Sequence, residues 1–270
     1  MTLRILVRGG GDLASGVILR CVRAGWQVCV TELARPLAVR RTVCFAQAVY
    51  DGVIEIEGVR GVRSSSYLDA RNALADSAVA VLVDPDCQIF HQFEPHVLVD
   101  ARMTKRVEPG RLFAQAMTIG LGPGFTAGVN CDSVVETLRG HYLGRVIWQG
   151  SAAPNTGLPD KVGNVQAERV LRAPADGEIQ SRAVIGDPIQ VGQVVALVDG
   201  QAVVSSIAGV LRGLVQDGVR VTLGMKVGDV DPRNDPRVCS FVSDKALAVG
   251  GGVLEAILSW PALRSKLYGE

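Results

Sequence analysis

The chain has 270 residues, 48% of them hydrophobic but only 5% aromatic, and its 28 basic residues almost balance its 27 acidic ones. This length exceeds that of a typical single domain, so we expect two domains, each large enough to bury a core. The balanced charge lacks the strong positive field on which nucleic-acid and anionic-membrane binding depend, so we expect neither partner.

The N-terminal apolar run, residues 1–7, is too short for a signal peptide or a membrane span before Arg8 interrupts it. Neither the cysteines nor the three histidines show the spacing of a zinc site, and there is no CxxC redox motif. These features predict a cytoplasmic protein with reduced thiols and no metal centre. The six cysteines are Cys21, Cys29, Cys44, Cys87, Cys131 and Cys239.

The first predicted elements are a strand, a glycine turn and a helix. Residues 3–8 are apolar and indicate a strand, and residues 12–24 have the pattern of a helix that Gly25 ends. A second strand at 28–30, a helix at 36–50 and a hairpin at 53–62 are predicted to follow.

The glycine turn carries the clearest motif. Residues 9–14 fit the pattern GxGxxA between a strand and a helix, where backbone N–H groups at the helix start can bind a phosphate. The acid 21 residues after Gly11 ends the second strand, where a carboxylate can accept hydrogen bonds from a ribose. Asp12 would repel a pyrophosphate, and the turn could also serve only to pack the helix on the sheet. The predicted nucleotide-binding residues here are Gly9, Gly10, Gly11, Asp12, Ala14 and Glu32.

Further strands are predicted at 79–83, 97–99 and 117–119. The first two are short apolar runs that end at Asp84 and Asp100, as buried parallel strands do. We therefore predict a Rossmann-like nucleotide-binding α/β domain with a mainly parallel sheet over residues 1–150. The two aspartates are candidates for an acid/base pair, although aspartates at strand ends usually cap the next helix.

Basic residues extend the candidate site. Arg40 and Arg41 lie in the predicted helix after Glu32, and Lys105 follows a strand end. Guanidinium and ammonium groups at these places could bind a phosphate, and solvated side chains are the alternative.

A second glycine turn leads into a predicted helix at 133–138. It contains Gly122 and Gly124, which would form another anion-binding turn or an ordinary sharp connection. Cys87 and Cys131 could carry sulfur or selenium only if a depressed pKa formed the thiolate. The sequence assigns no catalytic residue.

The second half of the chain contains an internal repeat. After a linker predicted at 151–168, three glycines and two apolar residues recur with an offset of 32 residues. The repeat predicts a small β domain over 169–233, in which each copy supplies half of one core. Residues 234–270 are predicted to be helical, and the glycines at 250–252 indicate either a restart of the helix or a close backbone contact.

Several of these segments together resemble a known family. The chain is similar to the YqeB family of selenium-dependent molybdenum hydroxylase system proteins. The resemblance implies a role in maturing such hydroxylases, with a hydroxylase or its maturation machinery as partner, and we also allow for a homo-oligomer. It rests on residues 8–16, 31–41, 119–128, 136–141, 228–233 and 250–258.

The 32-residue repeat separately resembles the half-motifs of biotinyl/lipoyl carrier domains. In those domains a modified Lys lies in the hairpin that joins the halves, but the joining segment here, residues 199–203, contains none. Lys226 falls within the second copy instead. The β domain is therefore predicted to be a docking or structural module.

Two functional hypotheses follow, with a third that needs no ligand. The first is an accessory factor that binds a nucleotide, either NAD(P) or the nucleotide part of a molybdenum cofactor. The second is an NAD(P)-dependent oxidoreductase of a small metabolite, for which no residue presents itself as the acid or base. The third is a ligand-free docking scaffold.

Overall fold

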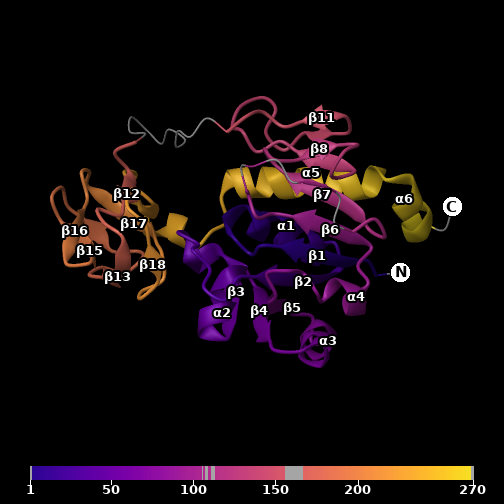
Figure 1. Ribbon diagram of the computed structural model, residues 1–270, viewed down its shortest axis with the longest axis horizontal. Helices are drawn as coiled ribbons and strands as arrows, with labels where there is room; N and C mark the ends of the chain where they lie inside the picture. Colours follow the sequence, from indigo (N-terminus) through magenta and orange to yellow (C-terminus); the bar gives the residue numbers. More distant parts are fainter. Residues whose placement is uncertain (1, 105, 107–108, 111–112, 156–166, 269–270) are drawn as a thin grey trace. The chain divides into compact units, whose positions relative to one another are not determined.

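The computed structural model describes residues 2–104, 106, 109–110, 113–155 and 167–268 (Figure 1). The chain divides into an α/β unit, Met1–Ala34, Phe45–Thr156 and Val242–Glu270, and a β unit, Arg35–Cys44 and Gly157–Phe241. The sequence-based boundaries at 150, 168 and 233 assume contiguous domains, whereas each unit is built from separate segments. Of the predicted linker, residues 156–166 lie outside the described residues.

A nine-stranded sheet forms the α/β unit, in the order β10-β9-β7-β6-β1-β2-β5-β4-β3. All neighbours are parallel except β3 with β4 and β9 with β10. The predicted α/β class with a mainly parallel sheet is confirmed. The strands are β1 (Arg4–Arg8), β2 (Gln27–Glu32), β3 (Val53–Ile56), β4 (Val59–Ser64), β5 (Val79–Val83), β6 (Val97–Asp100), β7 (Met117–Leu121), β9 (Ser133–Val135) and β10 (Val146–Ile147); β8 (Thr126–Ala127) and β11 (Gly150–Ser151) pair separately.

The order of the strands reverses at β1. The chain passes from β1 to β2 on one side, and later places β6, β7 and β9 on the other side. Ligands of open α/β sheets bind at such a reversal, outside the carboxyl ends of the strands. The carboxyl ends of β1 and β6 are therefore the first place to look for a site.

Helices cover the sheet. Side chains of α3 (Tyr67–Ala75) and α4 (Phe90–Phe93) pack with Leu6, Cys29 and Leu98 in one buried cluster. Figure 1 shows α1 (Asp12–Arg23) and α5 (Asp244–Ser259) together, on the side of the strands away from α3.

Two predicted helices are wrong. Residues 36–50 form two 3-10 turns, Arg41–Val43 and Phe45–Gln47, and the short α2 (Ala48–Asp51). Thr42 donates to the carbonyl of Cys239 at 2.7 Å, so contacts distant in sequence override the local helical pattern. Residues 133–138 begin instead as β9, where Val134 and Val135 are fully buried beside β7.

The glycines of α5 mark a close contact between helices. The helix runs unbroken from Asp244 to Ser259, which excludes a restart after Gly252. An added Cβ at Gly16 of α1 would overlap the carbonyl of Ala246, and one at Gly250 would overlap the carbonyl of Gly16. The backbones of α1 and α5 therefore touch, which offsets the poor helix propensity of glycine.

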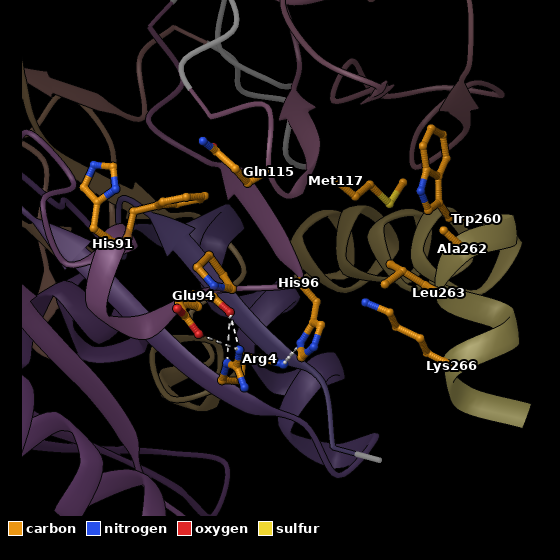
Figure 2. A pocket seen from close by; sticks show the side chains of 12 residues that line it. Arg4, His91, Glu94, His96, Gln115, Met117, Trp260, Ala262, Leu263 and Lys266 are labelled. Carbon is orange, nitrogen blue, oxygen red and sulfur yellow. Dashed lines mark hydrogen bonds and ion pairs between the residues drawn. The ribbon is translucent and has the colours of Figure 1, made fainter. Parts of the chain in front are cut away.

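After α5 the chain bends by 81° into α6 (Pro261–Tyr268). Among the described residues no single helix is long and apolar enough to cross a membrane, although α5 and α6 taken as one bent pair reach that length and composition. With the amino ends of β1 and β7, α6 borders a cavity of about 540 Å³ (Figure 2).

The β unit consists of two four-stranded antiparallel sheets, β12-β19-β17-β14 and β16-β15-β13-β18. Their pairing follows the sequence repeat, because Gly177 pairs with Val221 and, 32 residues away on both strands, Gly209 pairs with Ile189. Each half therefore completes the sheet of the other. The strands are β12 (Val170–Arg172), β13 (Gly177–Ser181), β14 (Pro188–Ile189), β15 (Val194–Val198), β16 (Gln201–Val204), β17 (Gly209–Leu214), β18 (Arg220–Val221) and β19 (Lys226–Asp231).

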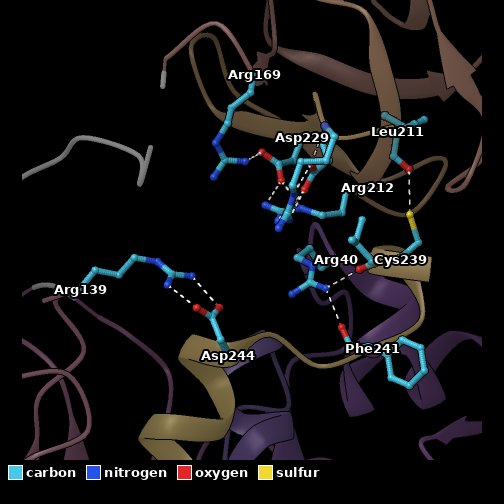
Figure 3. A network of polar contacts seen from close by, with 12 residues as sticks. Arg40, Arg139, Arg169, Leu211, Arg212, Asp229, Cys239, Phe241 and Asp244 are labelled. Atoms are coloured by element: carbon cyan, nitrogen blue, oxygen red, sulfur yellow. Dashed lines mark hydrogen bonds and ion pairs between the residues drawn. The ribbon is translucent and has the colours of Figure 1, made fainter. Parts of the chain in front are cut away.

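Buried charges hold the β unit together (Figure 3). Asp229 is fully buried and accepts hydrogen bonds from Arg169 and Arg212. Asp231, also fully buried, pairs with Arg212 at 3.3 Å and Arg233 at 2.7 Å. Every carboxylate in this network has an arginine partner, as buried charges require.

Candidate functional site

The candidate site lies where the glycine turn 9–11 meets the carboxyl end of β6. A Cβ built on Gly9 would lie 3.4 Å from backbone atoms of Ala101 and Arg102. The next turn along the edge follows β7, and a Cβ on its Gly124 would contact Thr104 at 3.1 Å. The fold thus brings three predicted loops to one edge of the sheet.

The first two glycines of the turn are explained by the protein itself. Gly9 has a φ of +91°, which other residues rarely adopt, and its N–H donates to the carbonyl of Thr31 at 2.8 Å. Gly10 lies against Ala46, whose nitrogen would be 2.8 Å from an added Cβ. Both positions need glycine for folding, with or without a ligand.

Gly11 differs from its neighbours. Its φ of −74° and ψ of −170° are open to any residue, and no atom lies within 4 Å of a Cβ built there. It is the N-cap of α1, and no side chain caps the helix. Neither backbone geometry nor packing requires glycine here, so the open space beside the helix start is available to a ligand.

Glu32 lies beside the turn, as its spacing predicts. One carboxylate oxygen accepts from the N–H of Gly10 at 2.7 Å, and the other accepts from the N–H of Leu33 at 2.8 Å. The carboxylate is partly exposed and keeps lone pairs for a sugar hydroxyl. It also occupies the Gly10 N–H, which a phosphate would otherwise use.

The other two residues of the motif lie in the first turn of α1. Asp12 is partly exposed and adds negative charge at the helix start. Ala14 is 1% exposed and packs in the core. Ala14 can therefore serve a ligand only through its backbone N–H.

Arg8 was not among the predicted site residues, but it is a buried arginine at this edge whose hydrogen bonds are incomplete. It ends β1, is 9% exposed, and lies 3.5 Å from a carboxylate oxygen of Asp100. One terminal nitrogen donates to the carbonyl of Pro85 at 3.2 Å, but Nε and the other terminal nitrogen have no hydrogen-bond partner. The signal that could have identified it is an arginine placed between the apolar run 5–7 and the glycine turn.

The predicted acid/base pair is not free to act as one. Asp84 accepts from the N–H groups of Gln88 at 2.9 Å and Ile89 at 2.8 Å, so it caps the following turn. Asp100 is 3% exposed and accepts from the guanidinium of Arg102 at 2.7 to 3.1 Å. Both carboxylates have structural partners.

Of the two cysteines considered as carriers, Cys87 is a neutral thiol. Burial raises the pKa of Cys87 to about 11, although a hydrogen bond from Thr31 and the charge of Arg8 act in the opposite direction. A thiol with this pKa is protonated near pH 7 and is a poor nucleophile. All six cysteines, Cys131 included, are buried, and none forms a disulfide.

The remaining predicted residues have other surroundings. Arg40 and Arg41 belong to the β unit, where Arg40 donates to the carbonyls of Val238 and Phe241 at 3.0 and 2.9 Å, and Arg41 donates to that of Leu214 at 3.1 Å (Figure 3). Both arginines therefore stabilise the β unit through contacts within it. Lys105 lies outside the described residues.

Gly122 and Gly124 are explained by close packing. A Cβ on Gly122 would meet the hydroxyl of Thr137 at 2.5 Å, and Gly124 is enclosed by Thr104 and Arg106. Their turn therefore lies at the same edge as Gly11 but offers less room. Among the described residues no group of three or more His, Cys, Asp or Glu side chains could hold a metal ion.

Comparison with known proteins gives one close sequence match. Over 254 residues the chain is 42% identical to a protein of Escherichia coli strain K12 that is described as the uncharacterized protein YqeB. This chain is a homologue of YqeB. The match covers 94% of the chain but 47% of YqeB, so the chain spans about half the length of the curated relative it matches. No protein-family model matches the chain.

Solved structures give only distant matches. An aspartoacylase family protein from Mesorhizobium loti is 12% identical, with 85% of each chain covered and a TM-score of 0.28. A succinylglutamate desuccinylase/aspartoacylase from Rhodobacter sphaeroides is 15% identical, with 87% of each chain covered and a TM-score of 0.29. Overlap this limited supports no inference about activity.

Proposed function

We propose that the protein is a cytoplasmic accessory factor for maturing a molybdenum hydroxylase, and that its α/β unit binds a nucleotide or the nucleotide part of a molybdenum cofactor. The pathway rests on the family resemblance of the sequence. The ligand rests on the carboxyl edge of β1, and above all on Gly11, a glycine beside open space that neither conformation nor packing demands.

The surroundings of Gly11 define how a nucleotide would bind. The N–H groups at the start of α1 would hold a phosphate, and Glu32 would accept hydrogen bonds from the ribose. Because Glu32 takes the N–H of Gly10 and Asp12 adds a second carboxylate, a pyrophosphate would meet few donors and two like charges. Contact through the sugar and a single phosphate suits these residues better.

The NAD(P)-dependent oxidoreductase is the second candidate, and the strand order favours it. Taken in chain order, β1, β2, β5, β6, β7 and β9 have the arrangement 3-2-1-4-5-6 of dinucleotide-binding sheets. However, Asp84 and Asp100 are engaged in a cap and an ion pair. An accessory role needs neither residue to move a proton, and for this reason we rank it first.

The β unit supplies the docking part of the proposal. Its halves resemble those of biotinyl/lipoyl domains, but the β15–β16 hairpin turns at Asp199 and Gly200 and offers no lysine. Each half presents an exposed apolar side chain at the equivalent turn, Val191 at 68% and Leu223 at 69% exposure. Such side chains can bind a protein partner. The double substitution Val191→Ser and Leu223→Ser should reduce co-purification with the hydroxylase, and unchanged recovery would remove the docking role.

The nucleotide proposal is tested by calorimetric titration with NAD, NADP, ATP and the molybdenum cofactor. Gly11→Arg should abolish binding and leave the melting temperature nearly unchanged, because its side chain fills only the open space. Gly251→Arg is the matched control, since Gly251 in α5 also has no atom within 4 Å of an added Cβ, and it should bind normally. Binding that survives Gly11→Arg would place the ligand elsewhere.

The identity of the ligand separates the three hypotheses. Binding of the molybdenum cofactor without NAD or NADP supports the accessory factor. Tight NAD binding that Glu32→Gln weakens by about tenfold supports the oxidoreductase, because one charge-assisted hydrogen bond has about that effect. If none of the four compounds binds, the docking scaffold is the account that remains.

A further inference from the structure

The amino ends of the central strands border a second candidate site. The cavity of about 540 Å³ lies between Arg4 at the start of β1, His96 just before β6, Met117 at the start of β7, and α6. Its volume is that of a small-molecule cleft. The glycine turn lies at the other end of β1, roughly 16 Å away for a strand of five residues. The cavity is therefore separate from the proposed nucleotide site.

One wall of the cavity is apolar and well supported. Trp260 lines it from the junction of α5 and α6, beside Leu263 and Met117. Its ring stacks on Trp148 with 6.0 Å between centroids and 17° between planes. This stacking fixes the plane of the indole, so a planar aromatic ring can pack against it without reorienting the side chain.

A second part of the wall, with side chains from β1 and from α6, carries positive charge. Arg4 donates to the carbonyl of Glu94 at 2.6 and 2.9 Å and pairs with the exposed carboxylate of Glu94 at 3.8 Å. Lys266 extends from α6 toward His96 (Figure 2). Within the described part of the chain, no ion pair is made by Lys266. After the Arg4–Glu94 pair is counted, one ammonium group remains without an opposing charge.

His96 adds a neutral donor to that wall. Its Nδ1 accepts from the backbone N–H of Arg4 at 3.0 Å, so in the neutral ring the proton is on Nε2. Burial lowers the pKa of His96, and the charges of Arg4 and Lys266 lower it further. The ring is therefore neutral near pH 7 and its Nε2–H can donate to an anion.

We propose that this cavity binds a small planar organic anion, with its ring against Trp260, Leu263 and Met117 and its carboxylate or sulfonate-like group at Lys266 and His96. The only carboxylate lining the cavity among the described residues is that of Glu94, which Arg4 balances. A neutral ring would gain only the apolar contacts, and a cation would meet Lys266.

The test uses two fluorescent probes with the same rings. The anionic probe is 1-anilinonaphthalene-8-sulfonate, and N-phenyl-1-naphthylamine is its counterpart without the sulfonate. The full chain should bind the anion at one saturable site, at least about tenfold more tightly than the neutral compound. Lys266→Gln should remove most of that difference, and Trp260→Ala should weaken both probes.

Arg264→Gln is the matched control, because Arg264 is an exposed cation of the same helix that does not line the cavity. It should leave both affinities unchanged, and a melting curve for each variant shows that the fold is retained. If Lys266→Gln and Arg264→Gln weaken binding of the anionic probe equally, the effect is one of net charge and the proposal is overturned. The proposal is also overturned if the two probes bind equally well, or if no saturable site is found.

Discussion

The two units each bury arginines beside aspartates, but they do so in different ways. In the β unit Asp229 and Asp231 are fully buried, and the guanidinium of Arg212 donates to both. In the α/β unit Arg8 is also buried, at 9% exposure, yet two of its nitrogens have no hydrogen-bond partner. A satisfied network stabilises a fold, whereas a buried donor without a partner is a cost that a ligand could relieve.

The largest effect should come from the satisfied network. Asp229→Asn leaves Arg169 and Arg212 buried without their shared carboxylate, so the β unit should lose about 3–5 kcal/mol of stability. Urea denaturation followed by circular dichroism measures this loss. Asp235→Asn removes only the exposed ion pair with Arg237, because the amide oxygen can still accept from the backbone N–H of Arg237 and cap the 3-10 helix Pro236–Cys239, so it should leave the midpoint unchanged. Equal midpoints for the two variants would show that the network is not structural.

Acid should destabilise the same unit. Burial raises the pKa of Asp231, but hydrogen bonds from Arg233 and the charge of Arg212 outweigh it and lower the pKa below its ordinary value of 3.8. A lowered carboxyl pKa adds stability that is fully present above pH 3.8 and is lost as the pH falls through the folded value. Arg233→Met should flatten this acid dependence in melting experiments. A curve parallel to that of the native protein would contradict the assignment.

The smallest change in stability should come from Arg8. Arg8→Met removes two unsatisfied donors and leaves Asp100 paired with Arg102, so unfolding free energy should change by less than about 1.5 kcal/mol. Urea denaturation followed by circular dichroism measures this change against the native protein. A stability loss as large as that of Asp229→Asn would erase the contrast between the two clusters.

Local patterns in the sequence predicted what local forces decide. The strand, turn and helix at 3–24, the position of Glu32 beside Gly10, and the 32-residue repeat all reappear in the structure. Short periodic segments fix these features, because strand alternation and glycine turns depend on neighbouring residues.

Features set by distant contacts were not predictable in this way. Residues 36–50 have a helical pattern, but Thr42 and Arg40 bond to backbone about 200 positions away, and the helix does not form. Likewise, the sequence alone suggests that Arg8 is solvated at the end of a strand. In the structure β6 pairs with β1 and places Asp100 beside it. A single sequence does not reveal which residues distant in sequence will be in contact. The glycines of α5 did indicate a close backbone contact, but not its partner α1.

The return of the chain to the α/β unit at Val242 has a consequence for synthesis. The groove that Gly16 opens on α1 is filled by Ala246 and Gly250, which leave the ribosome more than 200 residues later. Domains generally fold in the order in which they emerge. Here α1 must wait for α5, so the β unit can finish folding first and the nascent α/β core stays open to chaperones until α5 is synthesised.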